Sequence, residues 1–118
     1  MELVAYLGKD KENWGQVTAL INRFDCERVI LIKDQNSDDF PVNEKCVIVE
    51  IDPTMPLLKL KNEIKEKLSK ELSNEFEVAI SIASGTGKEH MALISALLSI
   101  PVGIRLVVFT KNGIEIIN

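Results

Sequence analysis

Two short segments of the sequence contain residue types that bind phosphate. The first consists of Gly8, Lys9, Asp10 and Lys11. The second consists of Ser84, Gly85, Thr86, Gly87 and Lys88. Glycine lets a ligand approach the backbone closely, and the free amides at the start of a helix attract an anion. Serine and threonine hydroxyls and the lysine charges add donors, so the two segments together predict a site for a phosphate or a nucleotide.

The glycines of the second segment also have a simpler explanation. Gly85 and Gly87 could do no more than form a tight turn between a strand and a helix. The ligand site is favoured over this alternative because two lysine-bearing loops are expected to converge.

The second segment departs from two well-known phosphate-binding motifs. A Walker A loop needs a glycine at position 82 and a hydroxyl at position 89, where the chain has Ile82 and Glu89. A dinucleotide fingerprint needs a third glycine at position 90, where the chain has His90. That fingerprint also needs an acidic residue at the end of a following strand, and the sequence pattern indicates none there. Neither an NTPase nor a dinucleotide-binding enzyme is therefore expected.

Three other side chains have a chemical role to consider. His90 is the only histidine and has no second ligand at metal-binding spacing, so we expect it at the surface or an interface and predict no metal site. Trp14 could stack on a base, but it begins the apolar face of a helix, which favours core packing. Asp10 could orient a nucleophile or cap the helix that begins near position 11.

Aspartates and cysteines elsewhere are expected to be structural or solvated. Asp34, Asp38 and Asp39 form a carboxylate cluster, but they lie in a polar stretch typical of a solvated loop. Cys26 and Cys46 are too few for a disulfide framework or a zinc site. We expect both cysteines to be reduced and at least half-buried.

Hydrophobic patterning predicts the elements that position the two segments. We expect strands at residues 3–7, 28–32, 46–51, 77–83, 104–109 and 114–117, and helices at residues 12–24, 56–73 and 88–99. Strands alternating with helices indicate an α/β fold, a three-layer, Rossmann-like domain with a mainly parallel sheet of about six strands. Asn112-Gly113 predicts a C-terminal β-hairpin.

The order of the strands decides where a ligand would bind. Residues 33–45 have no helical period, although a parallel crossover usually contains a helix, so the third strand is either antiparallel or follows an irregular connection. If the strand order is 3-2-1-4-5, both phosphate-binding segments lie where the order reverses. Open α/β sheets bind ligands at that point, beyond the carboxyl ends of the strands.

Length and composition narrow the possible classes of protein. The 118 residues suit one domain, residues 1–118. A net charge of −4 disfavours a protein that coats duplex nucleic acid. The longest apolar stretch, residues 91–98, is too short to span a bilayer, and the chain opens without an apolar leader. We therefore expect a cytoplasmic protein with no membrane partner.

The predicted helix at residues 88–99 is apolar on almost every side. Such a helix must be covered on both faces, and one small domain supplies only one cover. A symmetric partner subunit is the natural second cover, so the sequence predicts a homodimer.

Residues 83–91, Ala-Ser-Gly-Thr-Gly-Lys-Glu-His-Met, resemble the loop after the fourth strand in the CARF family, the CRISPR-associated Rossmann-fold sensor domains. The likeness lies in the Ser-Gly-Thr core, in Lys88 and in Met91, and extends to the apolar helix and the Lys-Asn-Gly hairpin that follow. The chain departs from the family in a longer spacing from Thr86 to Met91. Its first loop also lacks the serine or threonine common in the family.

The resemblance implies a dimeric sensor domain that binds a cyclic oligoadenylate second messenger across its two-fold axis, in CRISPR-linked antiviral defence. The ligand-binding residues would be Gly8, Lys9, Asp10, Lys11, Ser84, Gly85, Thr86, Gly87, Lys88 and Met91. No cofactor is expected. An effector domain C-terminal to the sensor, outside this chain, is a further implied partner.

Two other functions stay open at this point. The chain could be a metal-independent ring nuclease, in which Lys88, Thr86 and Ser84 align a 2′-hydroxyl with its own phosphodiester and stabilise the developing charge. It could also be a dimerisation domain whose loops bind no ligand.

Overall fold

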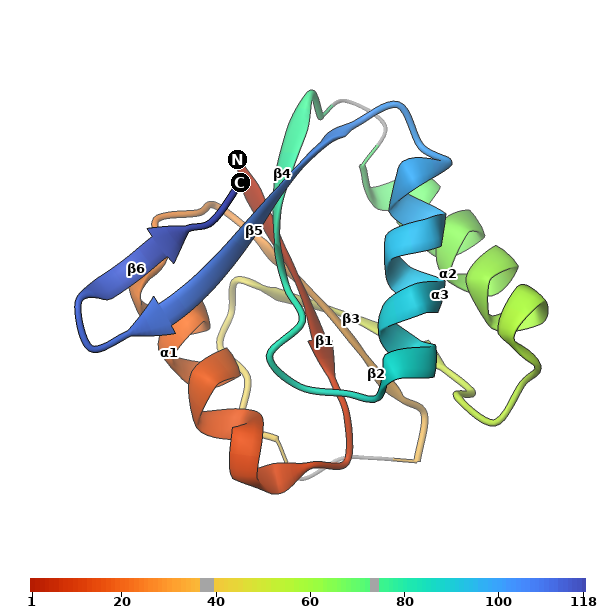
Figure 1. Ribbon diagram of the computed structural model, residues 1–118, viewed down its shortest axis with the longest axis horizontal. Helices are drawn as coiled ribbons and strands as arrows, with labels where there is room; N and C mark the ends of the chain where they lie inside the picture. The colour runs from red at the N-terminus through yellow and green to blue at the C-terminus, as the bar shows by residue number, and fades with distance from the viewer. Residues whose placement is uncertain (37–39, 73–74) are drawn as a thin grey trace.

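The computed structural model describes residues 1–36, 40–72 and 75–118, which form a sheet flanked by helices (Figure 1). The strands are β1 (Glu2–Leu7), β2 (Val29–Asp34), β3 (Cys46–Ile51), β4 (Glu77–Ser81), β5 (Gly103–Thr110) and β6 (Gly113–Ile116). The helices are the short 3₁₀ helix η1 (Lys11–Asn13), α1 (Trp14–Arg23), α2 (Leu57–Glu71) and α3 (Gly87–Leu98). Asp38 and Asp39, considered above, lie outside the described residues.

The strand order is β3-β2-β1-β4-β5-β6. All neighbours pair in parallel except β5 and β6, which form the antiparallel hairpin expected from Asn112-Gly113. The predicted α/β class, the mainly parallel sheet and the C-terminal hairpin are therefore confirmed. The third strand is parallel, and the described residues between β2 and β3 contain no helix. The order reverses between β1 and β4, as the ligand prediction requires.

Helices cover both faces of the sheet, and each face has its own core. In Figure 1, α2 and α3 lie together on one face and α1 lies on the other. β1 is central and alternates between the two cores: Val4 and Tyr6 face the α2–α3 side, while Leu3, Ala5 and Leu7 face α1. All five are at most 1% exposed. Burial of both faces explains why β1 reads as an unbroken apolar run instead of an alternating one.

Two element boundaries differ from prediction in ways that affect the site. β4 ends at Ser81, two residues earlier than expected, and this leaves a longer loop before α3. β2 continues to Asp34, which was predicted to lie in a solvated loop. That prediction is wrong because Asp34 pairs with Ile51 of β3, and this pairing extends the strand and buries the aspartate to 6% exposure. Asp34 is therefore an acidic residue at the end of a following strand, which the sequence pattern did not indicate.

No helix in the described ranges is both long and apolar enough to cross a lipid bilayer.

Candidate functional site at the reversal of strand order

The loops that follow β1 and β4 contact each other through their backbones. A Cβ atom placed on Gly8 would lie 2.6 Å from the Cα of Gly85 and 2.6 Å from Oδ1 of Asp10. No side chain fits in that space. Gly85 itself has a φ of +112°, a conformation that other residues rarely adopt. Both glycines are therefore required by the way the two loops meet, as the convergence argument expected.

A carboxylate and a buried hydroxyl join these loops. Ser84 is fully buried, and its Oγ donates to Oδ1 of Asp10 at 2.6 Å while accepting from the Gly8 amide at 2.9 Å. The Gly85 amide donates to the same Asp10 oxygen at 3.0 Å, and Asn13 Nδ2 donates to the other at 2.8 Å. Ser84 thus holds the loops together and does not present its hydroxyl to a ligand.

The same network bears on the capping role considered for Asp10. Its side chain makes no capping hydrogen bond to the helix that follows, so the capping role is wrong. Partial burial alone would raise the pKa of Asp10. The hydrogen bonds from Ser84, Asn13 and the Gly85 amide outweigh that effect and lower it. Asp10 is therefore a charged structural acceptor between the loops.

The side chains of Thr86 and Glu89 cap the start of α3 and leave two of its backbone amides without an acceptor in the helix. The Thr86 hydroxyl accepts from the Glu89 amide at 3.2 Å, and the Glu89 carboxylate accepts from the Thr86 amide at 2.8 Å. This capping box leaves the first two helical N–H groups, those of Gly87 and Lys88. A Cβ placed on Gly87 would meet no atom within 4 Å beyond its chain neighbours and the adjacent helix backbone, and Gly87 is exposed, so there is open space beside this residue. Thr86 therefore caps the helix, and Gly87 leaves room for a ligand beside it.

His90 supports the loop from the first turn of α3. Its Nε2 lies 2.7 Å from the Ser84 carbonyl oxygen, and because a carbonyl only accepts, Nε2 carries the proton. The ring meets Tyr6 edge-on, with centroids 6.4 Å apart. Burial, and next the negative charge of Glu89, raise the pKa of Tyr6, so its phenol stays neutral. His90 was expected at the surface or an interface; it is half-buried and its loop contact was not anticipated.

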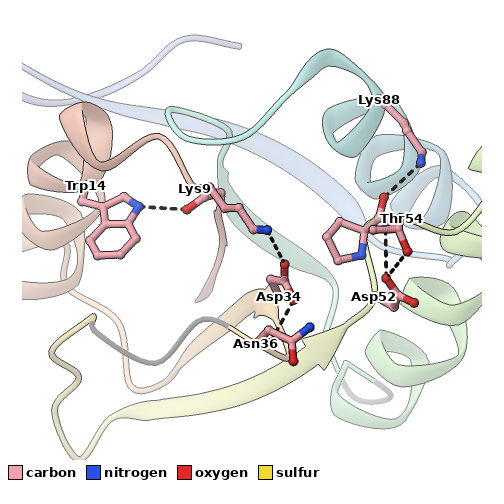
Figure 2. Close-up of polar contacts among 9 residues, drawn as sticks. Lys9, Trp14, Asp34, Asn36, Asp52, Thr54 and Lys88 are labelled. Atoms are coloured by element: carbon pink, nitrogen blue, oxygen red, sulfur yellow. Dashed lines mark hydrogen bonds and ion pairs between the residues drawn. The ribbon is translucent and has the colours of Figure 1, made fainter.

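The three lysines of the predicted site make contacts with different neighbours, two of them drawn in Figure 2. Lys9 Nζ lies 3.3 Å from Oδ2 of Asp34, at the end of β2. Lys88 Nζ donates to the Pro53 carbonyl at 3.0 Å, in the loop between β3 and α2. Lys11 Nζ lies 5.5 Å from the centre of the Trp14 ring, a cation–π arrangement. The ammonium group of Lys9 thus lies at the end of β2, and that of Lys88 lies beside the loop that follows β3.

Trp14 packs as expected and also fixes the first loop. Its ring meets Phe40 edge-on at 5.4 Å and contacts the core on the α1 face. Its Nε1 donates to the Gly8 carbonyl at 2.9 Å, a contact drawn in Figure 2. Core packing and loop anchoring are therefore both roles of this side chain.

Sequence reasoning missed the polar residues at the ends of β2 and β3. Asp34 is buried, whereas Asp52 is half-buried and accepts from the Thr54 hydroxyl and amide. Those hydrogen bonds, with a smaller contribution from the charge of Lys88, lower the pKa of Asp52. The available signal was position: each aspartate closely follows the end of a predicted strand. Asp34 and Asp52, together with Asp10 and Glu89, place negative charge beside the lysines of the predicted site, which the sequence analysis had considered without them.

Met91 lies away from the loops, in an apolar groove between α2 and α3. The groove has a volume of about 540 Å³, and its lining includes Leu57, Leu58, Ile94 and Leu98. Leu58 is 72% exposed and Leu98 is 74% exposed. Met91 therefore belongs to the uncovered face of α3, and its predicted role as a ligand-binding residue stays a prediction.

Cys26 is buried and Cys46 half-buried, and both are free thiols, as expected. Burial raises the pKa of the Cys26 thiol, so it stays protonated. Within the ranges that the structure describes, no group of three or more histidine, cysteine or acidic side chains could hold a metal ion.

Comparisons with known proteins support the fold. No protein-family model matches the chain. No curated protein matches it in sequence. Among solved structures, the chain is similar to the C-terminal domain of a hydrogenase from Pyrococcus furiosus, with a TM-score of 0.52 and 11% identity over 89% of each chain. At that identity the likeness shows the fold alone.

Proposed function

We propose that this chain is a cytoplasmic, dimeric sensor domain of the CARF type that binds a cyclic oligoadenylate in CRISPR-linked defence. The observation that carries the proposal is the direct contact of the Gly8 and Gly85 loops where the strand order reverses, with open space beside Gly87 at the start of α3. A bound phosphodiester in that space would accept from the Gly87 and Lys88 amides and gain from the helix dipole.

The lysines add charge that can be redirected to a ligand. The Lys9 side chain is 77% exposed, so its ammonium group is accessible to a ligand although it lies 3.3 Å from the buried carboxylate of Asp34. Lys88 donates only to a neutral carbonyl, and a phosphate oxygen is a stronger acceptor for an ammonium group. Lys88 can therefore turn from its present partner to a phosphodiester at little cost, and the accessible ammonium group of Lys9 can approach one as well.

The uncovered face of α3 supports the dimer. Met91 and Leu98 are 56% and 74% exposed, beside the half-exposed Leu57 of α2. Exposed apolar area of this kind commonly marks an interface. Since α3 begins at the loops and carries this face along its length, a second copy packed on it would bring two loop sites together.

Calorimetric titration with cyclic tetra-adenylate and cyclic hexa-adenylate tests the proposal. We expect one ring to bind per two chains. Lys88→Ala should weaken binding at least roughly tenfold, because it removes a charge-assisted hydrogen bond. Lys70→Ala is the matched control, since Lys70 is exposed on α2 and its ion-pair partner Glu66 is also exposed. Absence of binding to both rings, or equal affinity of the two variants, would overturn the proposed function.

Incubating a labelled ring with the protein in EDTA separates sensing from cleavage. Because the hydroxyl of Ser84 is engaged by Asp10 and Gly8, only Lys88 and Thr86 of the three candidate catalytic residues have groups that could approach the ring. We expect the ring to be recovered intact. Its conversion to linear product would instead identify a metal-independent ring nuclease.

A further inference from the structure

A buried carboxylate stands at the edge of the proposed site. Asp34 is the last residue of β2, and its side chain is 9% exposed. β2 is the immediate neighbour of β1, and Leu7 pairs with Lys33, so Asp34 stands level with the start of the Gly8 loop. Its Oδ1 accepts from the Asn36 amide at 2.9 Å, and its Oδ2 faces Lys9 Nζ. Figure 2 shows Asp34 between the side chains of Lys9 and Asn36.

The chemistry of this carboxylate limits what can approach it. An ionised carboxylate only accepts hydrogen bonds and repels phosphate. The folded protein has already removed most of the water around Asp34, so little further desolvation accompanies binding. When Lys9 turns to a phosphodiester, Oδ2 of Asp34 loses its cation and requires a donor. The part of the ligand that meets Asp34 must therefore be a neutral hydrogen-bond donor.

A ribonucleotide offers two kinds of neutral donor, and Lys9 decides between them. The sugar 2′-hydroxyl is on the carbon next to the one that bears the 3′-phosphodiester, whereas the amino group of adenine lies on the far edge of the base. Lys9 Nζ and Asp34 Oδ2 are only 3.3 Å apart. A cation and a carboxylate this close match a phosphate and a hydroxyl on adjacent carbons. Asp52, by contrast, is only half-buried, makes no ion pair with a loop lysine among the described contacts, and accepts from the Thr54 amide and hydroxyl at one oxygen.

We propose, resting on the proposed function above, that Asp34 binds a ribose 2′-hydroxyl of the ring and that this contact makes the site specific for RNA over DNA. In nucleotide-binding α/β proteins an acidic residue at the end of a strand near the first loop plays this kind of role on the ribose. Here the Lys9–Asp34 pair recognises a phosphodiester together with its neighbouring hydroxyl.

The test compares two rings and three forms of the protein by calorimetric titration. The rings are the cyclic oligoadenylate that binds and its all-2′-deoxy counterpart. The proteins are the wild type, Asp34→Asn, and Asp25→Asn, which removes the same charge from an exposed residue in the turn before β2, at the opposite end of that strand. The wild type and Asp25→Asn should prefer the ribose ring at least about tenfold. Asp34→Asn should lose most of that preference.

The ratio of the two affinities is the informative quantity. Removing Asp34 also releases Lys9, but this change affects both rings equally and cancels in the ratio. Asp34→Ser, which keeps an oxygen for the Asn36 amide, serves if Asp34→Asn fails to fold. The preference of the wild type for the ribose ring over the deoxyribose ring is measured without any variant, so that part of the test does not depend on whether a variant folds.

Several outcomes would overturn the assignment. Equal affinity of the wild type for the two rings would do so, as would a ribose preference that survives in both Asp34 variants. A third ring built from purine riboside lacks the amino group; if Asp34→Asn abolishes discrimination against that ring instead, the carboxylate recognises the base. If the all-adenylate ring itself fails to bind, the proposed function fails, and this inference fails with it.

Discussion

At the scale of single residues, Asp10 has the most partners at the site. It accepts hydrogen bonds from the side chains of Ser84 and Asn13 and from the Gly85 amide. One carboxylate thereby joins two loops that are more than 70 residues apart in the sequence. Its charge is an advantage here, because hydrogen bonds to an ionised acceptor are stronger than neutral ones.

We predict that Asp10→Asn destabilises the protein by about 1–3 kcal/mol at neutral pH, since an amide nitrogen faces at least one donor that the carboxylate accepted. The pKa of Asp10 is lowered in the folded state, so the stability it contributes is complete above its unfolded-state pKa of about 4. That contribution disappears as the pH falls through the folded-state pKa. Urea unfolding of wild type and variant between neutral and acidic pH measures the difference, which should shrink in acid.

Asp25→Asn provides the control, because the Asp25 side chain is exposed. It should change the unfolding free energy by no more than about 0.5 kcal/mol. A difference between wild type and Asp10→Asn that persists unchanged in acid would mean that the charge of Asp10 is not what holds the loops.

At the scale of elements, the contact between the β1 and β4 loops positions the start of α3. Three features act together: the absence of a side chain at Gly8, the positive φ of Gly85, and the capping box of Thr86. Trp14 and His90 brace the two loops from opposite sides through the Gly8 and Ser84 carbonyls. The position of the first amides of α3 is thus fixed by these loop contacts, most of which lie outside the helix.

We predict that Gly8→Ala costs about 1–3 kcal/mol of stability, the usual result of overpacking. The added methyl group would lie 2.6 Å from the Gly85 Cα, so the loops must separate. Gly15→Ala is the matched control: Gly15 is in α1, a Cβ there meets nothing within 4 Å, and alanine favours the helix. Chemical denaturation should therefore show opposite signs for the two variants. Equal effects would mean that the loops do not pack as closely as described.

At the scale of the whole molecule, the net charge is −4, but positive and negative side chains are nearly equal in number at the carboxyl-terminal edge of the parallel strands. The lysines there are Lys9, Lys11 and Lys88. The acidic residues there are Asp10, Asp34, Asp52 and Glu89. If the proposed phosphate ligand binds here, this balance of charges favours one that also offers hydrogen-bond donors, as a ribonucleotide does and an inorganic anion such as sulfate does not. The second global feature is the apolar groove between α2 and α3, which a single domain leaves uncovered.

We predict that the wild type sediments as a dimer and that Leu98→Glu sediments as a monomer. Leu98 is 74% exposed, so the substitution should leave the fold intact while placing a charge in the contact. Phe76→Glu is the matched control, because Phe76 is 95% exposed next to the start of β4, away from the groove. Analytical ultracentrifugation measures both. A monomeric wild type, or a dimer that survives Leu98→Glu but not Phe76→Glu, would contradict this interface.

The sequence by itself determined the fold class, the mainly parallel sheet, the C-terminal hairpin and the two loops at the reversal of strand order. These follow from local physics: the period of apolar residues distinguishes strands from helices, and Asn-Gly favours a tight hairpin turn. Glycine at positions 8 and 85 was expected to admit a ligand or to form a turn; the close approach of the two loop backbones at these glycines appears only in the structure.

Only the tertiary structure decided what each polar side chain does. Ser84 was expected to face the ligand but is buried between loops, and Asp34 was expected in solvent but extends β2 and contacts Lys9. Met91 was expected to be a ligand-binding residue at the start of its helix, and it lines the apolar groove between α2 and α3. These roles depend on partners distant in the sequence. The local pattern fixes which strand or loop a residue belongs to, whereas the packing of other elements fixes whether its polar atoms meet protein or solvent.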